Sequence, residues 1–197
     1  MIGALPEKLI VGDTEYGIRS DYRNVLQIFE AFSDQELEHG EKWIVAIYLL
    51  LEAFTCADDV YVAAEDGFDV NEAVKQIIWF ISAGQEPGDK KELPTYDWAQ
   101  DEQMIFSAVN KVAGKETREL EYLHWWTFLG YFNEVGEGTL SFIVGIRSKL
   151  NKKKKLEKHE MEFLNNNPGM VRLEKRKTTE ELEQEAKYKA LWKEVLG

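Results

Sequence analysis

Residues 120–132 read Leu-Glu-Tyr-Leu-His-Trp-Trp-Thr-Phe-Leu-Gly-Tyr-Phe, and this stretch decides the fold. Seven of its residues are aromatic when His124 is included. The residues that share one face at helical spacing are Tyr122, Trp125, Trp126, Leu129 and Phe132. Other apolar residues point in other directions, and a helix that is apolar all round is usually enclosed by its neighbours. The stretch therefore predicts a central helix, with Trp126 and Leu129 in the core and Trp125 nearer its edge.

Amphipathic patterns on both sides predict further helices. The clearest lies over residues 70–81, where apolar side chains recur at helical spacing. Similar patterns predict helices over residues 21–32, 43–54, 98–112 and 140–147. Capping-box patterns predict a short helix from Ser33 to Gly40 and a last helix over residues 178–196. Residues 85–94, with two prolines and several charges, are typical of an exposed loop.

The N-terminal region carries a hairpin signal. Two short β-type runs, at residues 9–11 and 16–18, flank the turn-forming pair Gly12-Asp13. Two strands alone are marginally stable in water, so this hairpin must pack on the helices or pair with another chain. The predicted fold class is mainly α: a helical domain with a short N-terminal β-hairpin and a basic C-terminal helical tail.

Composition limits the class of protein. The 197 residues, 44% hydrophobic, suffice for a core that needs no disulfide or metal. Cys56 is the lone cysteine, which excludes an internal disulfide and a cysteine-based zinc site. The first residues lack a secretory-signal pattern, and no apolar run approaches the roughly 20 residues of a membrane span. We expect no membrane partner.

Charge divides the chain unevenly. The formal net charge of −12 opposes generic binding to a phosphate backbone, so we expect no nucleic-acid partner. Residues 1–146 hold 10 basic and 27 acidic residues, whereas residues 147–197 hold 14 basic and 9 acidic ones. The pattern predicts an acidic helical domain over residues 1–150 and a basic, partly helical tail over residues 151–197. The tail is either an interaction arm or a solvated segment.

The sequence has few motifs that indicate catalysis, phosphate binding or metal binding. No glycine-rich phosphate loop is present, and His39, His124 and His159 lack a metal-ligand spacing. Acidic clusters such as Asp58-Asp59 fail the EF-hand pattern and are typical of solvated helix ends. We expect no catalytic residues, no cofactor and no metal, hence a protein that is not an enzyme.

Two segments are candidates for binding a protein partner. The aromatic stretch suits an interface as well as a core, and the lysine run suits either solubilisation or docking onto an acidic surface, including that of another copy. We therefore expect weak self-association. The candidate partner-binding residues are Tyr122, Trp125, Phe128, Tyr131, Lys152, Lys153, Lys154 and Lys155.

Several motifs resemble a protein family of bacteriophages. They begin with Ala4-Leu5-Pro6, the hairpin and Ile18-Arg19-Ser20-Asp21-Tyr22-Arg23. Tyr96-Asp97 with Asp101 follows, then Ile105-Phe106-Ser107-Ala108, the Leu-His-Trp-Trp-x-Phe string within residues 120–128, and Gly145-Ile146-Arg147-Ser148. Over residues 3–165 the chain resembles tail-assembly-chaperone-like proteins of long-tailed, siphovirus-type phages that infect Gram-positive bacteria.

The resemblance implies a function. Such genes lie beside that of the tape-measure protein, and the implied role is to bind the tape measure, keep it soluble and help tail-tube subunits polymerise around it. The implied partners are the tape-measure protein and the tail-tube subunits. The implied location is the cytoplasm of the infected host, with absence from the mature virion. A structural tail or neck/connector component is the alternative.

The sequence departs from the family pattern in two places. Residues 112–117 lack the turn that relatives carry near Gly114, and the chain after Asn165 has no match to the pattern. The resemblance therefore assigns no role to the end of the tail.

Overall fold

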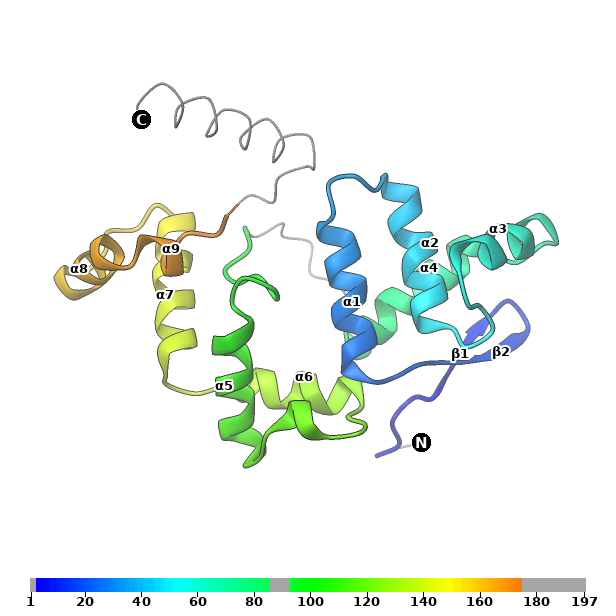
Figure 1. The fold of residues 1–197 in the computed structure, drawn as a ribbon, viewed down its shortest axis with the longest axis horizontal. Helices are drawn as coiled ribbons and strands as arrows, with labels where there is room; N and C mark the ends of the chain where they lie inside the picture. The colour runs from blue at the N-terminus through cyan, green and yellow to red at the C-terminus, as the bar shows by residue number, and fades with distance from the viewer. Residues whose placement is uncertain (1–2, 86–92, 175–197) are drawn as a thin grey trace, which may run out of the picture.

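The computed structural model describes residues 3–85 and 93–174 (Figure 1). It opens with an antiparallel hairpin of β1 (Lys8–Val11) and β2 (Thr14–Gly17), in which Leu9 pairs with Tyr16. The helices that follow are α1 (Tyr22–Ser33), α2 (His39–Leu50), α3 (Ala57–Glu65), α4 (Val70–Ile81), α5 (Glu102–Ala113), α6 (Trp125–Asn133), α7 (Thr139–Asn151), α8 (Lys158–Asn166) and α9 (Pro168–Val171), with a 3-10 turn η1 (Thr117–Glu119) before α6. The predicted mainly α class with its N-terminal hairpin is confirmed. The helix predicted over residues 178–196 lies outside the described residues.

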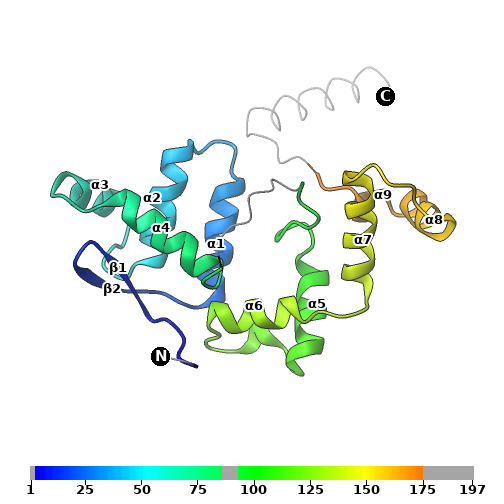
Figure 2. The same ribbon diagram turned by 180° about the vertical axis from the view of Figure 1, so that it is seen from behind.

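The helices form two groups that α6 connects. The hairpin, α2, α3 and α4 gather on one side of α1, and α5 and α7 stand on its other side, with α8 and α9 farthest away (Figures 1 and 2). Helix α6 lies across one end of both α1 and α5. The aromatic stretch therefore lies where the two groups meet, as a central helix should.

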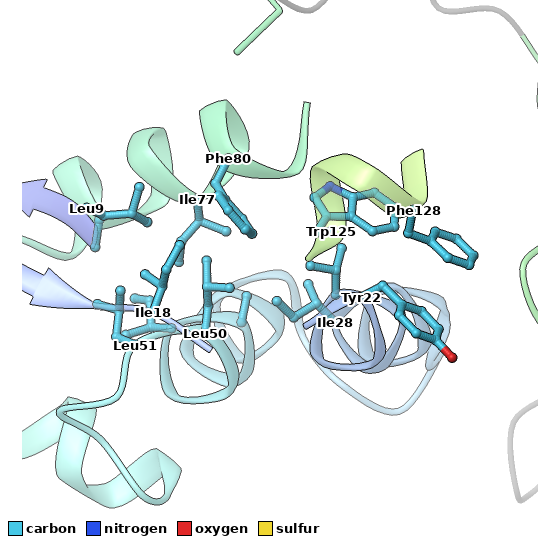
Figure 3. Packing of buried hydrophobic residues seen from close by; sticks show 14 of the residues in the cluster. Leu9, Ile18, Tyr22, Ile28, Leu50, Leu51, Ile77, Phe80, Trp125 and Phe128 are labelled. Carbon is cyan, nitrogen blue, oxygen red and sulfur yellow. The ribbon is translucent and has the colours of Figure 1, made fainter. Parts of the chain in front are cut away.

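One large core runs from the hairpin to α6 (Figure 3). On one side Leu9 and Ile18 pack with Leu50, Leu51 and Ile77, while on the other α6 packs against α1. Burial of such side chains is the main stabilising contribution, at about 1.5–3 kcal/mol for each large apolar residue.

The orientation of α6 corrects one prediction. Trp125 is the buried indole, with 1% of its surface exposed, whereas Trp126 is half-buried beside Trp79. The predicted face assumed that the helix already included Tyr122. His124 instead caps the helix, accepting the backbone N–H of Trp126 through Nδ1 at 3.0 Å, so the helical face begins at Trp125.

Local boundaries follow the capping chemistry. The short helix predicted from Ser33 to Gly40 is wrong, because Ser33 ends α1 and Gly40 lies in the first turn of α2. Glu38 opens α2 instead, in a reciprocal capping box with Glu41. The predicted helix end at Gly114 is confirmed, since Gly114 adopts a left-handed conformation with φ of 69°.

The chain after α7 is folded as far as Glu174. A second, small apolar cluster of Ile146, Leu156, Leu164 and Val171 fixes α8 and α9 against α7. The boundary predicted at residue 150 therefore falls inside a packed unit, which we call the C-terminal unit (α7–α9).

Candidate functional site

An elongated groove runs along α1 and faces the segment 93–99 that leads into α5. It encloses about 860 Å³. Its apolar lining consists mainly of half-buried side chains, which pack on the core and still line the groove. These residues are Leu26, Phe29, Phe32, Tyr96 and Trp98. We call this surface the α1 groove.

Aromatic contacts connect the two walls of the α1 groove. The Phe29 ring stacks on Trp98 with 5.7 Å between centroids. Beneath them Trp125 meets Phe29 at 5.8 Å and Trp98 at 6.0 Å, both edge-on. Offset and edge-to-face pairs of this kind contribute beyond their buried area. Helix α6 thus supports the groove from below through Trp125.

Two arginines cover the end of the groove nearest the start of α1. The guanidinium of Arg23 lies 4.7 Å from the ring centre of Tyr22, and that of Arg118 lies 5.0 Å from the ring centre of Phe106. Both distances fit cation–π contacts. Burial raises the pKa of the Tyr22 phenol and that of Tyr96, so both phenols stay neutral at physiological pH.

The remaining charge of the groove is acidic. Arg23 pairs with Asp21 at 3.0 Å, and Arg118 pairs with Glu116 at 2.8 Å. Hydrogen bonds from Arg118 hold the pKa of Glu116 at about 2, so this pair stays ionised over the physiological range. The other charged residues that line the groove are Glu30, Asp97 and Glu102. A ligand with basic flanks would therefore complement the rim.

Arg147 positions the wall formed by residues 93–99. Its five N–H groups all have acceptors: the carbonyl oxygens of Thr95, Met170 and Val171, and both carboxylate oxygens of Asp101, one of them at 3.0 Å. Arg147 and Asp101 are 4% and 1% exposed at their side chains. A buried pair with complete hydrogen bonding fixes geometry, and here it ties the wall to α7 and α9.

Further hydrogen bonds hold the same wall. Asn151 donates its side-chain N–H groups to the carbonyl oxygens of Leu93 and Pro94 at 3.2 and 3.1 Å. Asp101 also accepts the backbone N–H of Asp97 at 2.9 Å. The segment leading into α5 lies between α1 and α7 in both views (Figures 1 and 2). The C-terminal unit thus acts as a scaffold for the groove.

The opposite wall, α1, is fixed at its start. Asp21 accepts the backbone N–H groups of Arg23 and Leu123, which joins the first turn of α1 to the entry of α6. Arg19 donates to the carbonyl oxygens of Tyr48 and Leu51 at the end of α2. Residues of the Ile-Arg-Ser-Asp-Tyr-Arg, Leu-His-Trp-Trp-x-Phe and Ile-Arg-Ser motifs therefore build and support the groove.

The aromatic partner-binding candidates do not form one surface. Trp125 and Phe128 are 1% and 0% exposed, and the structure places both in the core against α1. Tyr131 is half-buried against the core. Tyr122 is 54% exposed and its hydroxyl lies 2.7 Å from that of Ser20, before the helix begins.

The lysine candidates lie elsewhere. Lys152, Lys153, Lys154 and Lys155 are exposed in the link from α7 to α8. This link is at the end of α7 remote from α6 in both views (Figures 1 and 2). The structure does not bring the lysine run and the aromatic helix together.

Metal-binding clusters and membrane-spanning helices are both absent from the described residues. Within residues 3–85 and 93–174, no set of three or more histidine, cysteine, aspartate or glutamate side chains is arranged to hold a metal ion. In the same residues, each helix is too short or too polar to cross a membrane.

The α1 groove was not predicted from the sequence. The amphipathic pattern over residues 21–32 places Phe29 and Phe32 on the buried side of a helix, and Trp98 begins the helix predicted over residues 98–112. The available signal was the pair Tyr96 and Trp98 shortly after Pro94, because two aromatic residues outside a helix need an apolar surface to pack on.

Comparison with known proteins places the chain among phage proteins. The model of the family described as "Bacteriophage Gp15 protein" matches residues 4–173. No curated protein matches the chain, and no solved structure does. The family match spans both walls of the α1 groove and the C-terminal unit that supports them. The chain therefore belongs to the bacteriophage Gp15 protein family.

Proposed function

We propose that the protein is a tail assembly chaperone that binds the tape-measure protein in the α1 groove, keeps it soluble and aids polymerisation of tail-tube subunits around it. The supporting observation is the groove itself: half-buried aromatic side chains in a phage protein, with walls built by the motif residues. The motifs resemble chaperones encoded beside the tape measure in siphovirus-type phages of Gram-positive hosts.

The chemistry of the groove suits an amphipathic helix. Helix α1 has 12 residues, which corresponds to about 18 Å of groove wall or about three turns of a bound helix. A client helix would place apolar residues at i, i+3, i+4 and i+7 against Phe29, Phe32 and Trp98. The acidic rim would favour lysine or arginine beside that stripe.

The rest of the surface suits a holding role. Residues 1–146 carry 27 acidic and 10 basic residues, a net charge that keeps a loaded complex soluble. Tube subunits that compete for the tape measure would release the chaperone by mass action. The proposed role needs no catalytic residue and no cofactor. With this role we propose that the protein acts in the cytoplasm of the infected bacterium. We also propose weak self-association, which light scattering across a concentration series would test.

Co-expression with the tape-measure gene of the same phage tests this proposal. The wild-type chain should raise the soluble fraction of the tape measure. Leu93→Glu, at the lip of the groove, should reduce that effect, whereas Val62→Glu on α3 should not. The two residues are matched, with 63% and 59% exposure. Equal solubilisation by both variants would contradict the groove as the client site.

The composition of the virion distinguishes the proposed chaperone from the alternative, a structural tail or neck/connector component. A chaperone leaves before assembly ends, so mass spectrometry of purified virions should find no stoichiometric copy. A constant copy number per particle would favour the structural component instead.

A further inference from the structure

We propose that copies of the chain associate head to tail, with the exposed acidic face of α3 in one copy docking on the basic end around α8 in the next copy. The inference specifies the surfaces of the weak self-association proposed above, and it needs no client. Three observations carry it: the positions of the two surfaces, their opposite charge, and the exposed apolar side chains on each.

The two surfaces lie at opposite ends of the molecule. In both ribbon views α3 stands at one end of the longest axis and α8 at the other (Figures 1 and 2). One copy therefore cannot bring its own α8 to its own α3, and a contact between these surfaces joins two copies. Because the surfaces differ, each copy keeps one of either kind. Such a contact grows into an open chain or closes into a ring.

The acidic end consists of α3 and its link to α4. Residues 43–74 hold seven acidic residues and no basic one. The exposed face of α3 shows side chains at i, i+3, i+4 and i+7, namely Asp58, Tyr61, Val62 and Glu65. Tyr61 is 47% exposed and Val62 is 59% exposed. The face thus presents two apolar side chains between two carboxylates, neither of which forms an ion pair within residues 3–85 and 93–174.

The basic end surrounds the start of α8. Residues 149–162 hold six lysines and three glutamates, so this end keeps a net positive charge. Two of the glutamates are already beside a lysine, since Lys149 lies 2.6 Å from Glu160 and 3.8 Å from Glu157. The link from α7 to α8 and the first residue of α8 carry the other lysines, all of them exposed. These lysines are available to face the carboxylates of another copy.

The same end also offers an apolar contact. A hollow on α8 is lined by Lys155, Lys158 and Met161, among others. Met161 is 44% exposed. Methionine and tyrosine are enriched in protein interfaces, and the flexible thioether of methionine adapts to irregular partners. The hollow therefore places an adaptable apolar side chain beside two lysines, as the counterpart of the α3 face.

The two faces match in length and in chemistry. Helices α3 and α8 each have nine residues, or about 13 Å. Laid side by side, Tyr61 and Val62 of one copy would cover Met161 of the next, with carboxylates opposite lysines on the rim. Faces this short bury less than the roughly 800 Å² per partner of a standard interface. The association is therefore weak and sensitive to salt.

Association through the ends leaves the α1 groove accessible. Helix α1 lies between the two ends in both views (Figures 1 and 2), so a chain of copies would repeat the groove along its length. Under the proposed function, a row of grooves would hold a long client at several points and gain avidity. A single copy still presents the whole groove.

Two full-length variants, each blocked at one end, test the inference by sedimentation velocity. The acidic-end variant carries Asp58→Lys and Glu65→Lys. The basic-end variant carries Lys154→Ser, Lys155→Ser and Lys158→Ser. All five positions are exposed. Serine replaces the lysines, because glutamate there would attract the new lysines of the acidic-end variant and restore a contact between blocked ends.

The matched control carries Glu134→Lys and Glu137→Lys. Both residues are exposed, at the end of α6 and in the link from α6 to α7, and the change in net charge equals that of the acidic-end variant. A general effect of net charge on association would therefore appear equally in the control.

We expect the mean mass of the wild type to rise beyond that of a dimer as its concentration increases at low salt. Raising the ionic strength from about 0.01 M to about 1 M should weaken the association about tenfold or more. Each blocked variant alone should associate at least about tenfold more weakly than the wild type, and the control should match the wild type. An equimolar mixture of the two blocked variants should form dimers and stop there, because both free ends of such a dimer are blocked.

Four results would overturn the inference. They are a wild type that stays monomeric at high concentration and low salt, a blocked variant that associates as strongly as the wild type, a mixture that remains monomeric, or a control that loses as much association as the acidic-end variant. None of them alters the Leu93→Glu comparison with the tape measure, which tests the client site in a single copy.

Discussion

The large core and the C-terminal unit are stabilised by different chemistry. The large core buries apolar side chains from the hairpin to α6, among them Trp125, Phe128 and Leu51. The C-terminal unit has a small apolar cluster of its own, formed by Ile146, Leu156, Leu164 and Val171, and depends on the hydrogen bonds of Arg147. Non-directional burial explains why the first region forms, while directional hydrogen bonds explain why the groove wall stands where it does.

Trp125→Ala should have the largest effect. It removes a fully buried indole and the hydrogen bond from its Nε1 to the carbonyl oxygen of Ile81 at 2.8 Å. We expect a loss of about 4–5 kcal/mol in the free energy of unfolding, measured by urea denaturation. Trp126→Ala should cost less, because Trp126 is half-buried. An equal loss in both variants would contradict the orientation of α6.

Arg147→Met should loosen the C-terminal unit selectively. It leaves Asp101 buried without its cation, a change that costs about 3 kcal/mol or more. Hydrogen exchange should speed up in α9 and residues 93–99, with the amides of α2 and α4 much less affected. A double variant with Asp101→Leu should recover part of the loss. Uniform acceleration across the chain would show that the two regions unfold as one.

His124→Ala should cost about 1–2 kcal/mol. It removes the side-chain cap of α6 and the 3.0 Å contact between Nε2 and the carbonyl oxygen of Pro6. Because Nδ1 accepts the N–H of Trp126, Nε2 carries the proton and donates to Pro6. His124→Asn can still cap the helix and should retain part of the stability in denaturant melts. If the asparagine variant is no better than alanine, capping is not the cause.

The smallest effect concerns Lys149 and Glu160, paired at 2.6 Å between α7 and α8. The hydrogen bond from Lys149 lowers the pKa of Glu160 below 4.5, and Glu160 raises the pKa of Lys149 above 10.5. Because the pKa of this carboxyl is lower in the folded than in the unfolded state, the carboxylate stabilises the fold at pH values above its unfolded-state pKa. That stabilisation is lost as the pH falls through the folded-state pKa. Wild type should exceed Glu160→Gln in stability at pH 7, with the difference vanishing on acidification. A difference that does not shrink on acidification would contradict the pairing.

Sequence patterns predicted what local periodicity controls. The hairpin, α1, α4 and the end of α5 at Gly114 follow from alternation, amphipathic spacing and a left-handed cap. The burial of Trp125 in place of Trp126 was not predictable without knowing that His124 starts the helix. A shift in the start of a helix changes which residues face the core.

Long-range hydrogen bonds account for what the sequence could not show. The groove exists because Arg147 holds Thr95, 52 positions away in the chain, opposite α1. Periodicity in a window carries no information on such a contact, although Arg147 and Asp101 stood within the motifs of the phage resemblance. Arg147 and Asp101 act as scaffold, and the α1 groove that they help to form lies beside them.

Hydrogen exchange of the full-length protein with and without a soluble tape-measure fragment tests the central claim most directly. If the fragment lies in the α1 groove, amides of residues 22–33 and 95–102 should gain protection on binding, and those of α3 should be unchanged. Protection confined to α6, or to the lysine run and α8, with none at α1, would contradict the groove as the client site.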